Sequence, residues 1–211
     1  MTEVSTREQM IAAAERLAAE RGLGAMSLRS VQDASGQRNK SAAHYHFGSR
    51  EGLIEAVVAA RMGPVNERRL EMLAALDAQP SSPTLRDLAA VLVVPLAEHT
   101  VAVPGSHWAR FLAQGLADPT LSSVVRRNFE GRSYRDVRAR IVAALDHVPP
   151  TRRARRTGHA VGLVVLSLAT TEAQLTTSGS ARIPLAELVT DLIDICAAVL
   201  AAPAAAVTTH H

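Results

Sequence analysis

Cationic and hydrogen-bonding side chains gather between residues 27 and 50, where acids are almost absent. Arg29, Arg38, Lys40 and Arg50 face a single carboxylate, that of Asp33. Such cations contact DNA phosphates, and arginine, lysine and amide side chains also read base edges in the major groove. We therefore predict that the following residues bind DNA: Ser27, Arg29, Gln37, Arg38, Asn39, Lys40, Ser41, His44, Tyr45, Ser49 and Arg50.

Two short helices are expected to position these side chains. Leu28, Val31 and Ala34 form the apolar stripe of the first helix, and Ser27 can cap it. Gly36 suits a positive φ in the turn, and Asn39 can cap a second helix that runs through His44. This pattern is a helix-turn-helix, whose second helix enters the major groove, although an ordinary αα-corner has the same outline.

The flanking segments complete a small N-terminal domain. A helix is predicted over 6–21, capped by Ser5 or Thr6 and ended by the glycine-rich 22–24. Phe47 is expected to pack under the three helices, which gives a three-helix DNA-binding domain at 1–50. A fourth helix starts at 49–51, and Gly63-Pro64 predicts a kink or short break before the apolar pattern resumes at Leu70.

The rest of the chain is predicted to be helical, so the fold class is all-α. Prolines 83, 119 and 184 are placed at first helical positions, and helices are expected over 85–99, from 108, over 121–145, 151–177 and 185–200. The segment 161–169 is apolar all round, which predicts burial on every side. We read 51–202 as an effector-binding and dimerisation domain whose last two helices self-associate, and 203–211 as a disordered tail.

Composition excludes several classes of protein. The chain has 211 residues, 47% of them hydrophobic, and one cysteine, Cys196, which fits a reducing cytoplasm. The N-terminus lacks a signal-peptide core, and the longest apolar run, 160–169, is about half of a membrane span. No phosphate loop, dinucleotide fingerprint or nucleophile motif is present, so neither an enzyme nor a cofactor is predicted. His44 and His46 have no accompanying ligand cluster, so no metal is expected.

The N-terminal segment resembles the tetracycline-repressor (TetR) family of bacterial regulators over about residues 7–58. The likeness rests on Ala13 to Leu17, Glu20-Arg21-Gly22, the 34–36 turn and the exit 44–53. The turn 36–39 is one residue longer than the usual pattern, and His44 stands where a phosphate-contacting tyrosine is common, with Tyr45 next to it. The resemblance implies a small-molecule pocket and a two-fold dimer through the last two helices. It also implies that the reading helices lie about 34–36 Å apart on a pseudo-palindromic operator.

The chain has few aromatic side chains, and polar residues on otherwise apolar helices are the better candidates to line an effector pocket. The candidates are Trp108, Phe111, Gln114, Phe129, Tyr134, His159 and Glu172. The predicted function is a ligand-responsive transcriptional repressor that binds double-stranded DNA and an unknown small-molecule effector and has no membrane partner. The alternatives are an architectural DNA binder without effector and a helical enzyme.

Overall fold

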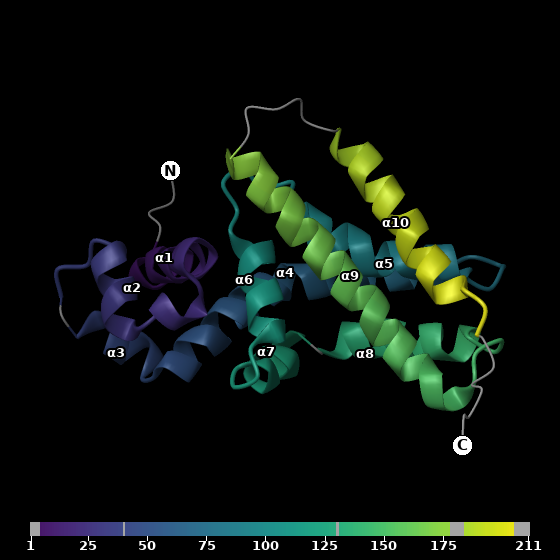
Figure 1. Ribbon diagram of the computed structural model, residues 1–211, viewed down its shortest axis with the longest axis horizontal. Coiled ribbons are helices and arrows are strands. Elements are labelled where there is room, and N and C mark those ends of the chain that lie inside the picture. The colour runs from purple at the N-terminus through teal and green to yellow at the C-terminus, as the bar shows by residue number, and fades with distance from the viewer. Residues whose placement is uncertain (1–4, 40, 130, 178–183, 205–211) are drawn as a thin grey trace, which may run out of the picture.

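The computed structural model describes residues 5–39, 41–129, 131–177 and 184–204. This part of the chain contains ten α-helices and a 3-10 helix, η1, and no strand, which confirms the all-α prediction. The elements are α1 (Thr6–Arg21), η1 (Leu23–Ala25), α2 (Leu28–Ala34), α3 (Ala42–Phe47), α4 (Arg50–Asp77), α5 (Leu85–Glu98), α6 (Trp108–Ala117), α7 (Ser122–Phe129), α8 (Arg132–Ala144), α9 (Pro150–Thr177) and α10 (Leu185–Ala201). Figure 1 shows α1–α3 grouped at one end and α4 leading away from them into the larger helical part. None of the described helices is long and apolar enough to cross a membrane.

The capping signals place α1 and α2 where the sequence predicts them. Ser5 Oγ accepts a hydrogen bond from Glu8 N at 3.2 Å, and Gly22 ends α1 with φ of 83°. This φ lies in the region that glycine reaches without steric cost. Ile11 and Ala14 are fully buried, so the apolar stripe of α1 packs into the core as expected.

The fourth helix is continuous, which corrects the expected break at Gly63-Pro64. α4 runs without interruption from Arg50 to Asp77, with Pro64 inside it on the exposed side. The buried stripe continues across this proline through Met62, Val65, Arg69 and Leu73, so packing holds the helix together where one backbone hydrogen bond is lost. Leu70, expected on that stripe, is 42% exposed, and Arg69 takes the inward position instead.

Helix starts in the second part differ from the prediction in detail. Thr84, and not Pro83, begins α5 by forming a capping box with Asp87. Pro119 lies in the turn before α7, and Pro184 is the N-cap residue of α10.

The single helix expected over 121–145 is two helices. α7 ends at Phe129, and Gly131 starts α8 in an extended conformation. A Cβ on Gly131 would lie 3.1 Å from Asn66 Nδ2, so α8 begins at a close approach to α4. The apolar pattern of the sequence continues across the corner between α7 and α8, so this corner, which contacts α4, could not be predicted from it.

α9 and α10 match their predicted ranges closely but are not buried on all sides within one chain. α9 packs against α6 and α10, and α10 packs against α5. On the outer face of α9, Leu166 is 63% exposed, and no atom lies within 4 Å of a Cβ built on Gly158 or Gly162. Burial of the whole circumference of α9 is therefore wrong for the isolated chain, which leaves an apolar, small-residue stripe uncovered.

Two arginines near the start of α9 bind backbone carbonyls that follow α8 or end α10. Arg153 donates from Nε to Val148 O at 2.8 Å and from Nη2 to Asp146 O at 3.1 Å. Arg156 donates to Leu200 O at 3.2 Å, at the C-terminal end of α10. Cations are favourable at helix C-termini because the last carbonyls lack partners.

Candidate nucleic-acid interface

The first helix of the pair is fixed by reciprocal serine bonds. Ser30 N donates to Ser27 Oγ at 3.0 Å, and Ser27 N donates to Ser30 Oγ at 2.8 Å. This capping box satisfies two backbone donors that a helix start leaves unpaired. The hydroxyl of Ser27, predicted to contact DNA, thus already has a structural role.

The turn is longer and α3 starts later than the sequence predicts. Gly36 has φ of 72°, as expected. Asn39 does not cap α3 directly, because its Oδ1 accepts from Ser41 N at 3.1 Å and from Ser41 Oγ at 2.9 Å in a tight local turn. α3 therefore begins at Ala42 and carries His44 and Tyr45 within its single exposed face.

A buried amide sets the angle between the two helices. Gln32 on α2 is only 7% exposed, and its Oε1 accepts from Ala43 N at 3.4 Å. Ala43 and Phe47 turn the other face of α3 into the core, and the Arg7 guanidinium lies 5.8 Å from the centre of the Phe47 ring. Consequently the buried face of α3 is held against the core, and the side chains of His44, Tyr45 and His46 point to the solvent.

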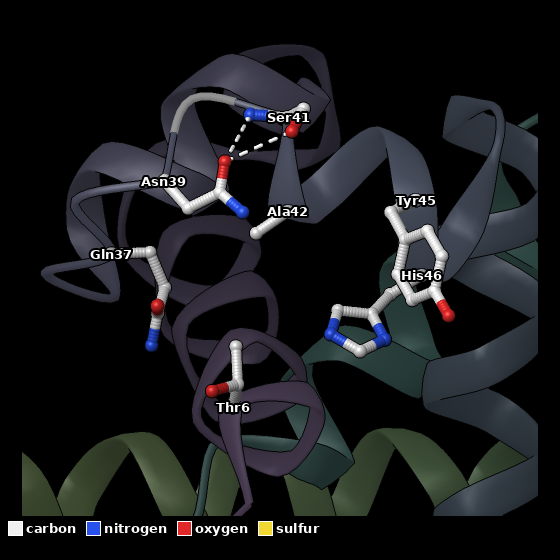
Figure 2. Close-up of a pocket in the computed structure, with 7 residues that line it drawn as sticks. All are labelled: Thr6, Gln37, Asn39, Ser41, Ala42, Tyr45 and His46. Atoms are coloured by element: carbon white, nitrogen blue, oxygen red, sulfur yellow. Dashed lines mark hydrogen bonds between the residues drawn. The ribbon is translucent and has the colours of Figure 1, made fainter.

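A hollow of about 390 Å³ opens beside α3 and collects several predicted contact residues. Figure 2 shows Gln37 and Asn39 on one side of it, Tyr45 and His46 on the other, and Thr6 from the start of α1 below. The Tyr45 side chain is 85% exposed, and its ring meets that of His46 edge-on at 5.3 Å. The hollow is lined by hydroxyl, amide and imidazole groups, which can both donate and accept hydrogen bonds.

Two of the predicted DNA-contact residues, Ser49 and Arg50, lie at the start of α4, and both already form hydrogen bonds within the protein. Ser49 Oγ accepts from Gly52 N at 3.0 Å and so caps α4. Arg50 donates from Nε to Met26 O and from Nη2 to Leu23 O, both at 2.8 Å. Arg50 is therefore first a brace between α4 and η1, and only its remaining nitrogen is left for other contacts.

The predicted DNA-contact residues fall into three groups. Gln37, Asn39, Ser41 and Tyr45 share the hollow, whereas Ser27, Ser49 and Arg50 hold helix starts. Arg29, Arg38 and His44 are exposed. Lys40 lies outside the described residues. Two residues that the sequence did not predict also take part: Thr6 lines the hollow, and Gln32 supports α3 from its buried side.

Two sets of contacts join this region to the larger helical part. Gln114 on α6 accepts from Leu23 N at 3.1 Å and donates to Ala18 O at 2.9 Å, so one amide bridges the end of α1 and η1. Arg61 on α4 donates to both oxygens of Glu15, at 2.5 and 3.3 Å, and to Glu8 at 3.0 Å. Burial raises the pKa of Glu15 even though Arg61 is beside it.

The predicted effector residues take part in several separate sets of contacts. Trp108 and Phe111 stack in the core at 5.7 Å, and Phe129 and Tyr134 pack together elsewhere at 5.1 Å. His159 is exposed on α9.

Glu172 is committed to the start of α6. It accepts from Ser106 Oγ at 2.7 Å and from the amides of Ala109 at 3.1 Å and Arg110 at 3.0 Å, and Arg110 Nε adds a bond at 3.3 Å. Gln114 and Glu172 are thus fastenings of α6, a role that spacing alone did not reveal.

The arrangement of α1–α4 is typical of one class of DNA-binding protein. A short exposed helix stands on a braced helix pair, and a fourth helix runs from it into a separate helical part. This is the arrangement of a helix-turn-helix regulator. Residues 10–57 match the family model described as bacterial regulatory proteins, tetR family.

Solved structures share the whole fold at low sequence identity. The transcriptional regulator FadR from Bacillus subtilis, in complex with stearoyl-CoA, is 12% identical with a TM-score of 0.59, over 92% of this chain and 97% of that one. A transcriptional regulator from Rhodococcus sp. Rha1 is 16% identical with a TM-score of 0.56, over 93% and 96%. AmtR from Mycobacterium smegmatis is 19% identical with a TM-score of 0.50, over 94% and 95%.

No curated protein matches the sequence. Residues 10–57 are thus similar to the N-terminal, DNA-binding part of tetR-family regulatory proteins, and the chain shares its overall fold with solved transcriptional regulators.

Proposed function

We propose that this chain is a cytoplasmic, ligand-responsive repressor that binds a pseudo-palindromic operator as a homodimer and releases it when a small molecule binds the larger domain, residues 51–202. The main support for this proposal is the exposed face of α3, which Gln32 holds from the buried side and which borders the hollow. The helix-turn-helix presents its second helix to the major groove, and Arg38, Ser41, His44 and Tyr45 lie on or beside that helix.

The uncovered stripe on α9 supports the dimer. Gly158 and Gly162 leave open space beside the exposed Leu166, so a second helix can approach the backbone closely. Two copies joined there would place two α3 helices about 34 Å apart, one turn of B-DNA.

The contacts through α6 support ligand response. α6 touches α9 through Glu172 and the end of α1 through Gln114, so a shift of α6 would alter the position of the DNA-binding domain. The stearoyl-CoA complex of FadR shows that a protein of this fold holds a small molecule. Release would follow from a higher affinity of the ligand for the dimer that does not bind DNA.

The test is operator selection from genomic fragments followed by binding titrations. Arg38→Ala and Lys40→Ala should each weaken binding about tenfold or more while the helical circular dichroism stays unchanged. Arg132→Ala, an exposed arginine on α8, is the matched control and should bind normally. Wild-type affinity in both interface variants would reject the assigned face. Binding that falls with salt equally for all sequences would instead identify an architectural DNA binder.

A further inference from the structure

An arginine lies completely inside the protein on the apolar stripe of α4. Arg69 is 0% exposed and stands between Val65 and Leu73, which are themselves buried. Arginine is almost never fully buried unless a partner neutralises it. No salt bridge involves Arg69 in the described part of the chain, and Glu172, the buried acid on α9, is bound elsewhere.

Only one nitrogen of Arg69 has hydrogen-bond partners. Nη1 donates to Asn66 Oδ1 at 3.0 Å and lies 3.4 Å from Ser133 Oγ, which itself donates to Asn66 Oδ1 at 2.8 Å. Nε and Nη2 are buried and have no partner. These two nitrogens carry parallel N–H bonds on one edge of the guanidinium, the edge that a carboxylate binds with both oxygens.

In three other described arginines, Arg61, Arg50 and Arg153, both nitrogens of the same edge have partners. In Arg61 it binds the two oxygens of Glu15, in Arg50 it binds two carbonyls, and in Arg153 it binds two more. Each of those side chains is more exposed than Arg69. An edge without a protein acceptor costs more free energy on Arg69 than it would on these three arginines, because Arg69 is fully buried.

The charge of Arg69 persists under ordinary conditions. Burial lowers its pKa to about 10, so the guanidinium is still protonated at neutral pH. A single cation in apolar surroundings is neutralised by a single negative charge. A monocarboxylate matches that charge and the two-donor edge together, whereas a phosphate group carries about twice the charge.

We infer that Arg69 binds the carboxylate of a small apolar monocarboxylic acid through Nε and Nη2, with Asn66 and Ser133 holding the guanidinium from its other side. Tyr134, near enough to interact electrostatically with Arg69, and Phe129 beside it offer an apolar wall for the body of the ligand. This inference rests on the proposed function, since it gives the chemical class of the effector.

The test compares acids with their neutral amides on the full-length protein without DNA. Benzoate and hexanoate at 10 mM, at matched ionic strength, should raise the wild-type melting temperature by roughly 2 °C or more. Benzamide and hexanamide should not. Arg69→Met should fold with an unchanged or higher melting temperature and lose the carboxylate response. Arg68→Met, an adjacent arginine that is partly exposed, is the matched control and should keep the response.

Several results would overturn the inference. One is the absence of a carboxylate response in the wild type, and another is a response that survives in Arg69→Met. A third concerns Glu130, which lies outside the described residues. If Glu130→Gln and Arg69→Met lower the melting temperature equally and carboxylates have no effect, the partner is internal. Should Arg69→Met not fold, the NMR signal of the Arg69 Nε–H group in the wild type replaces it, and this signal must shift with benzoate and not with benzamide.

The two proposals fail separately. Specific DNA binding without any carboxylate response would reject the acid effector and leave the regulator intact. A carboxylate response without specific DNA binding would do the reverse.

Discussion

Gly52 lacks a side chain at a position where no side chain fits. A Cβ there would lie 2.2 Å from the carbonyl oxygen of Phe47, at the corner between α3 and α4. Gly52→Ala must therefore push α3 away from α4, and we expect it to lower the free energy of unfolding by about 1–3 kcal/mol. Urea unfolding measures this loss.

Gly24→Ala is the control for this change. A Cβ on Gly24 meets nothing within 4 Å, and the variant should stay within about 0.5 kcal/mol of the wild type. Equal stabilities for the two variants would show that the α3–α4 corner yields easily.

Cys196 is fully buried, and burial raises the pKa of its thiol to about 11. The thiolate is the reactive form, and the ordinary pKa is near 9.0. Native protein at pH 8 should therefore react with a thiol reagent at least about a hundredfold more slowly than unfolded protein. Stopped-flow absorbance with and without urea checks this, and similar rates would mean that α10 opens readily.

At the scale of elements, the Arg61–Glu15 pair should be decisive for how α4 holds α1. Arg61→Met leaves the Glu15 carboxylate 5% exposed and without its main partner. We expect a loss of about 2 kcal/mol at neutral pH, less than for a fully buried pair because Arg61 is 30% exposed. The pKa of Glu15 is already raised on folding, so the loss should shrink as pH falls and the carboxylate takes up a proton.

The double variant Glu15→Gln with Arg61→Met tests the cause. It removes the charge together with its partner, and it should recover much of the stability. If the two losses simply add, the pair is not coupled and α1 is held by other contacts.

Helices with strong local signals could be predicted from the sequence. Ser5 and Gly22 bound α1, and Ser27 begins α2, because capping is a property of neighbouring residues. The predicted start of α3 was too early. Asn39 binds the backbone amide of Ser41 in the longer turn instead of capping the helix, and the apolar pattern of the helix does not reveal this bond. A kink or short break was expected at Gly63-Pro64, and the helix does not break there because tertiary packing on both sides of Pro64 outweighs one missing hydrogen bond.

The candidate site was predictable only in part. The exposed tips of the helix-turn-helix follow from composition and spacing. Arg69 does not, because burial of a charge depends on helices distant in the sequence, and its only local signal is its register with Met62, Val65 and Leu73. Gln114 and Glu172 were predicted as ligand contacts because they are polar residues on apolar helices. In the structure they bind backbone groups at the end of α1 and at the start of α6.

At the scale of the whole molecule, the exposed stripe on α9 makes a direct prediction about assembly. Leu166→Glu places a charge where the proposed partner helix would pack, and it should turn a dimer into a monomer. Sedimentation velocity at micromolar concentration distinguishes the two. Leu70→Glu, on the exposed side of α4, should remain dimeric. A wild-type monomer, or a dimer that tolerates Leu166→Glu, would place the contact elsewhere.

The amide of Gln114 also limits how freely the DNA-reading head can be transplanted. It completes the end of α1 from a position 96 residues away, through Ala18 O, while also receiving Leu23 N. A chimaera that joined residues 1–50 to the body of a distant relative would keep the helix-turn-helix but lose both bonds of Gln114, and the backbone amide of Leu23 at the start of η1 would have no partner. We expect such hybrids to bind the operator less specifically because the DNA-binding domain is held less firmly, even though all its side chains are unchanged.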